Sequence, residues 1–234
     1  MSKQTRKDPS GAGFGGHLIT LSDSSSSASE AYRTLRTNLM YARIDTPPKV
    51  ILITSPGTTE GKSTTCANLG VVLAQAEKKT LIVDCDLRKP TMHKTFGLRN
   101  FQGVVDVLAG GRSLQDTLQE TLLKSLRVLT VGPIPPNPAE LLSSRRFADF
   151  MSLARREFEY VLMDAPPVQL VSDAAILATQ ADGVLVVLDA QKTRKSGLRQ
   201  TVRSLENVGA NILGTVMNNV DASAGYYPSD YTYS

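Results

Sequence analysis

Short apolar runs alternate with amphipathic segments along most of this 234-residue chain. Runs with strand character lie at residues 50–53, 79–83, 126–131, 158–163, 183–188 and 211–216. Segments with apolar positions three or four residues apart lie between them, and one such stripe joins Leu198, Val202, Leu205 and Val208. Continuous apolar strands separated by helices are typical of a mostly parallel sheet with helices on both faces. The pattern therefore predicts one α/β domain.

The N-terminal segment breaks this pattern. Residues 1–28 are rich in Gly and Ser and have almost no apolar periodicity, which predicts a mobile arm. Residues 27–30 resemble a capping box and predict a helix that runs to about residue 43. Glu30, Arg33 and Arg36 recur every three residues on this helix. From spacing alone they indicate an exposed helix face with a Glu30–Arg33 ion pair.

The C-terminal segment also lacks periodicity. Residues 221–234 carry Tyr226, Tyr227, Tyr231 and Tyr233, among only seven tyrosines in the whole chain. Nothing alternates with these side chains, so they resemble exposed phenols on a tether. A tail packed on the surface and a binding peptide remain as alternatives. The chain thus divides into an arm (1–28), a domain (29–220) and a tyrosine-rich tail (221–234).

Composition narrows the functional classes. The formal charge of +4, from 26 basic and 22 acidic residues, favours an anionic ligand or surface without demanding nucleic acid. Cys66 and Cys85, the two cysteines, suggest neither a zinc site nor a disulfide framework, so we expect a reducing compartment. No signal peptide is visible, and no apolar stretch approaches the ~20 residues of a membrane span. We therefore expect a soluble chain.

Residues 55–64 have the composition of a phosphate-binding loop. They read Ser-Pro-Gly-Thr-Thr-Glu-Gly-Lys-Ser-Thr, directly after the first apolar run and before a helical segment that ends near Ala76. Small residues let the backbone wrap a phosphate with its N–H groups. On this solvent-facing loop, Lys62 is expected to bridge the β- and γ-phosphates of ATP, and Ser63 to ligate Mg²⁺. A Gly-Lys-Ser triplet alone could be chance, but the strand before it and the helix after it favour a nucleotide site.

The loop departs from the strict pattern at one position. Pro56 stands where the first glycine belongs, and Gly57 is expected to take over the turn. The residues expected to surround the nucleotide are Gly57, Thr59, Glu60, Gly61, Lys62, Ser63 and Thr64.

Carboxylates follow two of the predicted strands. Asp84 and Asp86 follow residues 79–83, and strand alternation puts them on one face while Cys85 turns toward the core. Asp164 follows residues 158–163 as a Walker B aspartate would, next to the phosphate loop. Ligands bind at this edge of parallel sheets, so one carboxylate could hold Mg²⁺ and another could accept a proton. The alternative for Asp84 and Asp86 is a solvated turn with a helix-capping aspartate, and the alternative for Asp164 is an aspartate that starts a proline turn.

Two asparagines end the last predicted strand. Asn218 could hydrogen-bond an adenine edge, and an ordinary turn at Asn218 and Asn219 is the competing interpretation.

Taken together, these motifs resemble the bacterial tyrosine kinases of capsular and exopolysaccharide synthesis, in the form that is separate from its membrane activator. The resemblance is carried by residues 29–38, the GKST loop, residues 84–90, 132–142 and 164–167, and the tyrosine tail. It implies a fold of the P-loop NTPase type and an enzyme that transfers phosphate from ATP, with Mg²⁺, to protein tyrosine.

The resemblance also implies roles for single residues. Lys62, Asp84 and Asp86 would be catalytic. Asp84 would be both the base and a residue of the metal site, and Asp86 and Asp164 would complete the Mg²⁺ environment. Glu30, Arg33 and Arg36 match a subunit-contact motif, which replaces their interpretation as an exposed face. The tail tyrosines Tyr226, Tyr227, Tyr231 and Tyr233 would be phosphoacceptors, modified between subunits.

Partners follow from the same resemblance. They are a transmembrane activator of the polysaccharide co-polymerase type, further copies of this chain in a ring, protein tyrosine substrates and a cognate phosphotyrosine phosphatase, with no nucleic acid. The expected location is the cytoplasm, at the inner face of the plasma membrane.

Two other classes remain. Partitioning and division switches of the wider deviant-loop ATPase group carry a signature lysine where this chain has Gly57, and their membrane-binding members end in an amphipathic helix rather than in tyrosines. A catalytically idle scaffold would not need Lys62, Ser63 and the three aspartates together.

Overall fold

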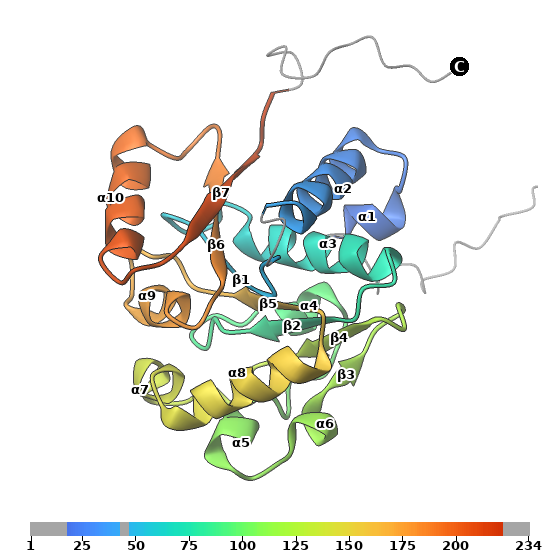
Figure 1. Ribbon diagram of the computed structural model, residues 1–234, viewed down its shortest axis with the longest axis vertical. Coiled ribbons are helices and arrows are strands. Elements are labelled where there is room, and N and C mark those ends of the chain that lie inside the picture. Colours follow the sequence, from blue (N-terminus) through green and yellow to red (C-terminus); the bar gives the residue numbers. More distant parts are fainter. Residues whose placement is uncertain (1–17, 43–46, 222–234) are drawn as a thin grey trace, which may run out of the picture.

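The computed structural model describes residues 18–42 and 47–221. Within these residues the chain forms a seven-stranded sheet in the order β3-β4-β2-β5-β1-β6-β7 (Figure 1). The strands are β1 (Val50–Thr54), β2 (Thr80–Asp84), β3 (Gln119–Glu120), β4 (Leu126–Leu129), β5 (Tyr160–Asp164), β6 (Gly183–Asp189) and β7 (Ile212–Asn218). Only the β3–β4 pairing is antiparallel among the strand pairs of this described part. The predicted mostly parallel sheet is confirmed.

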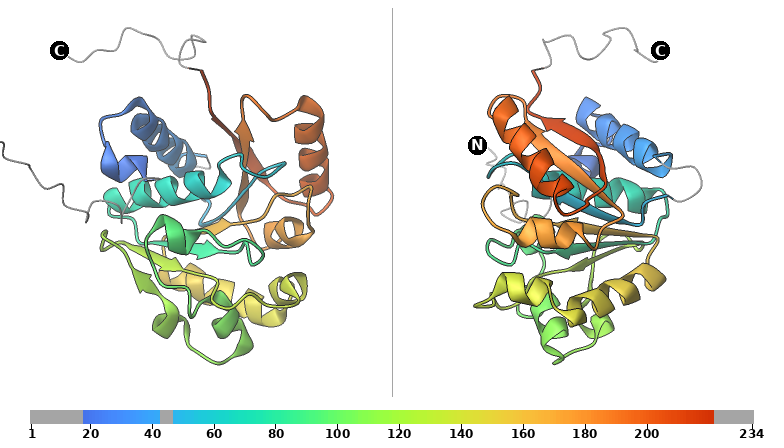
Figure 2. Two further views of the ribbon diagram at one scale, coloured as in Figure 1. Left: turned by 180° about the vertical axis from the view of Figure 1, so that it is seen from behind. Right: turned by 60° about the vertical axis from the view of Figure 1, so that its left-hand side comes forward.

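Helices cover both faces of the sheet, as Figures 1 and 2 show. One face carries α1 (Ile19–Ser22), α2 (Ser27–Met40), α3 (Lys62–Gln75) and α4 (Met92–Thr95). The other carries α5 (Val104–Ala109), α6 (Leu114–Thr117), α7 (Pro138–Leu142), α8 (Arg145–Glu157), α9 (Asp173–Ala178) and α10 (Lys195–Glu206). Alternate residues of β1 enter the two separate cores, since Val50 and Leu52 join one and Ile51 and Ile53 join the other. None of the helices in the described residues is long and apolar enough to cross a membrane.

The start of the described chain differs from the predicted arm. Leu18 and Thr20 are buried against α3, and Thr20 donates to Asn68 Oδ1 from its backbone nitrogen (3.1 Å) and its hydroxyl (2.8 Å). Residues 18–28 therefore belong to the folded domain. Helix α1 is a single turn, too short to give a periodic signal. Residues 1–17 lie outside the described residues.

Helix α2 begins with a different cap from the predicted one. The side chain of Ser26, one residue before the expected capping box, accepts a hydrogen bond from the backbone nitrogen of Ser29 at 3.2 Å. The helix ends at Met40 rather than near residue 43. Several consecutive serines precede the helix, and local sequence does not distinguish among them as caps.

Two elements differ from their predicted burial. Helix α3 is buried all along residues 65–74, because α2 and α1 pack on its outer side (Figure 2). The spacing in the sequence predicts a single apolar face along Cys66, Leu69, Leu73 and Ala76, which is narrower than the buried surface found here. Strand β7 was expected to be buried but is partly exposed, with Met217 54% exposed, because it forms the edge of the sheet.

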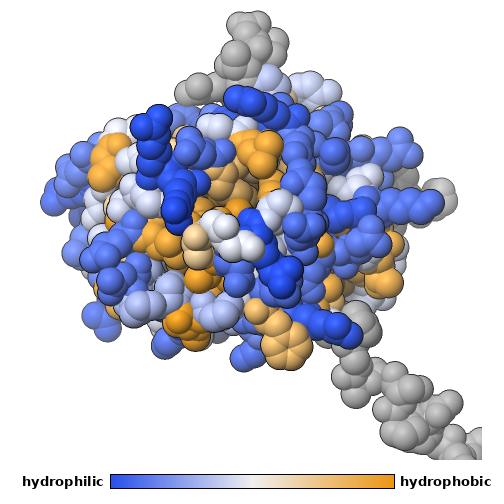
Figure 3. Space-filling view, turned by 90° about the horizontal axis from the view of Figure 1, so that it is seen from below, coloured by the Kyte–Doolittle hydropathy of each residue, from blue (hydrophilic) through white to orange (hydrophobic). Residues whose placement is uncertain are grey.

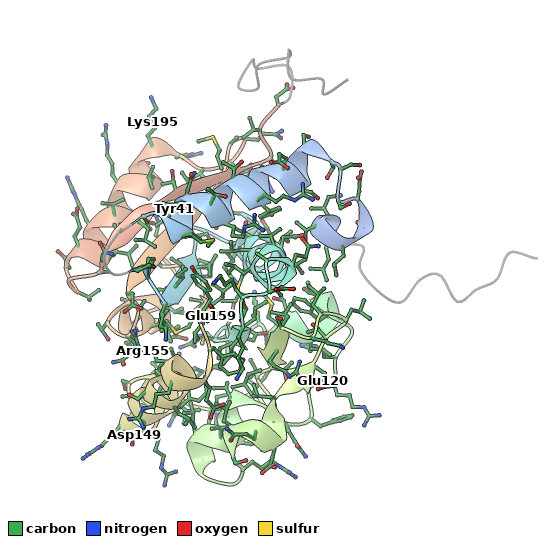
Figure 4. All side chains as sticks on the ribbon, turned by 45° about the vertical axis from the view of Figure 1, so that its right-hand side comes forward. Tyr41, Glu120, Asp149, Arg155, Glu159 and Lys195 are labelled. Carbon is green, nitrogen blue, oxygen red and sulfur yellow. The ribbon has the colours of Figure 1, made fainter. Side chains whose placement is uncertain are left out.

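The ion pair between Asp182 and Arg155 fixes the start of β1. Asp182 Oδ2 accepts from the backbone nitrogens of Lys49 (2.9 Å) and Val50 (2.8 Å). Arg155 Nη1 lies 2.8 Å from both Asp182 oxygens, and its Nη2 donates to Gln180 O at 3.0 Å. Figure 4 shows Arg155 at the C-terminal part of α8. These bonds join α8, β1 and the turn before β6.

The proline-rich loop at residues 132–138 borders a cavity. Pro135 and Pro136 line a space of about 370 Å³ together with Leu108 of α5 and Leu141 of α7. Helices α5, α6, α7 and α8 make up the lower part of the molecule in Figure 1. Figure 3 shows that lower face, on which apolar residues lie among hydrophilic ones.

Candidate nucleotide and phosphoryl-transfer site

The site forms where three parallel strands end at one edge of the sheet. Strand β5 lies between β1 and β2, and Asp164 pairs in register with Ile53 on one side and Asp84 on the other. The phosphate loop leaves β1, and α3 begins at Lys62. The structure thus brings together the lysine and the strand-end carboxylates that the sequence predicted.

The loop turns at different residues from the one expected. Left-handed backbone angles occur at Thr59 (φ 58°) and Gly61 (φ 92°), whereas Gly57 is not among the residues with positive φ. A Cβ atom at Gly61 would also collide with the side-chain nitrogen of Asn218. Gly61 is therefore required both for its conformation and for the close approach of β7.

The buried side chain of Glu60 links the loop residue Gly57 to Thr193 by two hydrogen bonds, which we call the brace. Glu60 Oε2 accepts from the Gly57 nitrogen at 2.9 Å, and Oε1 accepts from the Thr193 hydroxyl at 2.6 Å. Asn218 Nδ2 donates to the Glu60 carbonyl at 3.0 Å. Because this nitrogen faces the loop, an adenine contact by Asn218 would come from Oδ1. Thr193 was missed from the sequence, since it lies outside every motif.

Lys62 is largely buried, which differs from the expected solvent-facing loop. Its side chain is 12% exposed, and Nζ lies 3.1 Å from Asp86 Oδ2 and 3.6 Å from Asp164 Oδ1. Nζ also donates to Ser63 Oγ at 3.0 Å. Burial lowers the pKa of Lys62, but Asp164 and Asp86 outweigh it, so the pKa lies above its ordinary value. Lys62 is therefore a fixed positive charge in a poorly hydrated place.

Asp84 is fully buried behind the loop. Oδ1 accepts from the Asp86 nitrogen at 3.2 Å, and Oδ2 accepts from the nitrogens of Thr91 (2.9 Å) and Met92 (3.0 Å). Burial, followed by the neighbouring Asp164 carboxylate, raises the pKa of Asp84 to about 8 despite these hydrogen bonds. The carboxyl group can thus exchange a proton near neutral pH.

Asp164 has the least satisfied carboxylate of the site. Both oxygens are buried, and neither accepts a hydrogen bond from the described part of the chain. Burial raises the pKa of Asp164, and the Lys62 ammonium opposes the rise. A buried carboxylate is costly unless cations neutralise it; Lys62 Nζ supplies one positive charge from 3.6 Å, and a metal ion would supply more. The orphaned oxygens beside Ser63 fit Mg²⁺.

The metal would not be held by protein carboxylates alone. In residues 18–42 and 47–221 no group of three or more His, Cys, Asp or Glu side chains is arranged as a metal site. Mg²⁺ commonly takes one or two carboxylates and completes its shell with water and phosphate oxygens. Ser63 and Asp164 fit that role, with Asp84 and Asp86 nearby.

A cavity of about 530 Å³ opens over the loop. It is lined by Thr58, Thr59, Gly61, Lys62, Ser63, Thr64, Asp86, Arg88, Lys89, Thr91, Pro166, Pro167, Leu170 and Val171. Asp86 is thus the predicted carboxylate that reaches the cavity wall, whereas Asp84 and Asp164 are fully buried.

The predicted subunit-contact residues lie on α2. Arg33 Nη1 pairs with Glu30 Oε2 at 2.8 Å, as the spacing predicted. Arg36 Nη1 instead donates to the Val72 carbonyl of α3 at 3.0 Å, near the C-terminal end of that helix, where a cation is favourable. The tail tyrosines lie outside the described residues.

The strand, loop and helix, with a buried lysine facing strand-end aspartates, define a P-loop nucleotide-binding protein. Residues 48–217 match the family described as AAA domain, and the chain belongs to it. The sequence is 43% identical over 215 residues to tyrosine-protein kinase YwqD of Bacillus subtilis, covering 90% of this chain and 91% of that protein. The chain therefore belongs to the bacterial tyrosine-protein kinases, and the resemblance seen in the sequence is confirmed.

Solved structures agree with this assignment. The kinase domain of Escherichia coli tyrosine kinase ETK superposes with a TM-score of 0.85 at 31% identity, covering 93% of this chain and 84% of that one. MinD of Pyrococcus horikoshii, solved with Mg-ADP, has a TM-score of 0.62 at 24% identity over 72% of this chain and 69% of that one. The likeness to MinD shows the shared fold alone.

Proposed function

We propose that this protein is an ATP-dependent protein-tyrosine kinase that phosphorylates its own tail and acts in capsular or exopolysaccharide synthesis. The observation that carries the proposal is the position of Lys62 between the carboxylates of Asp86 and Asp164, where the phosphate loop ends and α3 begins. Phosphoryl transfer needs positioning and neutralisation of charge more than covalent chemistry.

Each residue of the cluster has a separate task. Lys62 and the loop N–H groups bind and orient the phosphates, and Ser63 and Asp164 would hold the metal. When bound, ATP would supply the phosphoryl group, and Mg²⁺ would supply further positive charge beside it. Because the protein groups are fixed before the reaction, little reorganisation is needed when negative charge moves.

We assign Asp84 as the base that accepts the phenolic proton. Its pKa of about 8 supports the role, since a base works best with a pKa near the operating pH. Asp84 does not line the cavity whereas Asp86 does, so Asp86 is the competing base and the matched comparison. Asp84→Asn should abolish transfer and leave Mg-ADP affinity within a few-fold of wild type. If Asp86→Asn shows this pattern and Asp84→Asn does not, Asp86 is the base.

Phosphorylation is proposed to occur between subunits of a ring held together by Glu30, Arg33 and Arg36. Tyr233 lies 12 residues beyond Asp221 (233 − 221), and the r.m.s. end-to-end distance of a random-coil chain of 12 residues is roughly 20 Å. Full activity would need a membrane activator that recruits the kinase to the cytoplasmic face of the membrane. A phosphotyrosine phosphatase would reset it.

A mixing experiment tests both the kinase and its geometry. Full-length Lys62→Met chains are incubated with active chains that lack residues 222–234, together with Mg-ATP. Phosphotyrosine on the Lys62→Met chains is the expected result, because they offer the tail but cannot transfer phosphate. If they stay unmodified while each intact wild-type chain modifies itself, transfer occurs within one chain.

Light scattering tests the assembly. The unphosphorylated protein should be large, and phosphorylation of all four tail tyrosines should produce a monomer, because about −6 to −8 charges are added per chain. The triple variant Glu30→Ala/Arg33→Ala/Arg36→Ala should also be monomeric. An unchanged mass in both states rejects the ring.

A further inference from the structure

The cavity over the phosphate loop has two chemically different parts. The loop N–H groups and the Lys62 ammonium suit phosphates, and the Asp86 carboxylate suits a metal ion that accompanies them. Pro166, Pro167, Leu170 and Val171 provide an apolar lining that a triphosphate does not use. Leu170 is 60% exposed although it is a large apolar side chain. An exposed leucine beside a phosphate site is suited to an apolar group of the second substrate.

This apolar wall is fixed to the same strand end as the phosphate loop. The Thr54 hydroxyl donates to the Pro166 carbonyl at 2.8 Å, and the Val168 nitrogen donates to the Ser55 carbonyl at 2.9 Å. Two consecutive prolines limit the freedom of the backbone here. The wall therefore keeps a constant position relative to the transferred phosphate.

A second fixed group, Arg88, lies in the same lining. Its Nε and Nη2 atoms donate to the two carboxylate oxygens of Asp173 at 2.9 and 3.1 Å. Asp173 is fully buried, whereas the Arg88 side chain is 43% exposed. Because a guanidinium has further N–H donors, the buried carboxylate holds Arg88 in place and leaves donors for a ligand.

We infer that this part of the cavity is the acceptor subsite: Leu170 and the prolines take the tyrosine ring, and Arg88 binds a carboxylate beside that tyrosine. The inference rests on the proposed kinase function and names the substrate class, a tyrosine with an acidic neighbour. The chain itself contains such a sequence, because Asp230 directly precedes Tyr231. Asp173 acts as a positioning residue for Arg88.

Adenine is a poorer occupant of this wall. Asn218, the predicted adenine contact, lines a different cavity of about 280 Å³, formed with Tyr32, Leu35, Val216 and Met217. The acceptor subsite and the adenine site would thus lie in separate cavities.

Steady-state kinetics with a peptide of residues 222–234 test the ring contact. For full-length Leu170→Ala, we expect the peptide KM to rise about tenfold, with kcat and calorimetric Mg-ADP affinity unchanged, because only apolar contact is lost. Leu122→Ala is the matched control, since Leu122 is 78% exposed and lies outside this cavity. Weaker Mg-ADP binding by Leu170→Ala would assign the wall to the nucleotide. An unchanged KM would also overturn the inference.

A double-mutant cycle tests the arginine contact. The second peptide carries Asp230→Asn, and the enzyme variant is Arg88→Ala/Asp173→Asn, which avoids leaving a buried carboxylate unpaired. Phosphate on Tyr231 is measured by mass spectrometry. For this tyrosine, wild type should show a KM about tenfold higher with the substituted peptide, and the variant should not distinguish the two peptides. Arg88→Lys should restore part of the discrimination. Equal discrimination by wild type and variant refutes the contact. If wild type phosphorylates neither peptide nor its own tail, the proposed kinase function fails rather than the subsite.

Discussion

The brace behind the phosphate loop gives a graded prediction for nucleotide binding. Glu60 accepts one hydrogen bond from Gly57 and one from Thr193, so Thr193→Val removes one bond and Glu60→Ala removes both. A hydrogen bond to a charged group contributes about 1.5–3 kcal/mol. We expect the loss to appear in binding, because a loop that is less populated in its bound conformation lowers the apparent affinity.

The expected size follows from these bonds. Thr193→Val should weaken Mg-ADP binding about tenfold, and Glu60→Ala should weaken it at least a hundredfold. Isothermal titration calorimetry measures both values. Thr179→Val is the control, because the exposed Thr179 hydroxyl bonds only the Ile176 carbonyl of its own helix (2.8 Å) among the described contacts. Two results would refute this role of the brace in nucleotide binding. One is wild-type Mg-ADP affinity in Thr193→Val, and the other is an equal loss of Mg-ADP affinity in Thr193→Val and Glu60→Ala.

Three further predictions concern charge. Lys62→Met should abolish transfer. It should also lower the free energy of unfolding in urea by about 2 kcal/mol, because it leaves the buried carboxylates of Asp86 and Asp164 without the lysine cation, whereas a lysine on a solvent-facing loop would have little effect. A wild-type free energy of unfolding in this variant would contradict the prediction. Asp164→Asn should weaken nucleotide binding in Mg²⁺ and leave binding in EDTA unchanged by calorimetry, and equal losses in both would argue against a metal ligand. Burial opposes ionisation of Asp182, but hydrogen bonds from the Val50 nitrogen and the Arg155 guanidinium hold the pKa of Asp182 below its usual value. The ionised Asp182 therefore stabilises the fold above about pH 4, and this stabilisation is lost as the pH falls through the folded-state pKa. Asp182→Ala should therefore cost about 2 kcal/mol at pH 7, and the difference from wild type in thermal melts should shrink as the pH is lowered through the acidic range. A difference that stays constant would contradict the ion pair.

The sequence predicted the parts of the site that belong to continuous motifs. Apolar runs located the strands, and parallel strands end at one edge, so Asp84 and Asp164 could be expected near Lys62. The position of β5 beside β1 followed the expected arrangement.

Long-range supports could not be predicted in this way. The contacts of Glu60 with Thr193 and of Arg88 with Asp173 join residues 133 and 85 positions apart, and only packing brings them together. The burial of Lys62 has the same origin, because its carboxylate neighbours come from two other strands. The exposure of β7 depends on its place at the sheet edge, which its apolar sequence does not reveal.

Mass spectrometry of the full chain after incubation with Mg-ATP tests the kinase assignment most directly. The account predicts phosphate on tyrosine within residues 226–233 of the wild-type chain, and none on Lys62→Met incubated alone. ADP formation by a folded wild-type chain without any phosphotyrosine would contradict it and would indicate an ATPase switch.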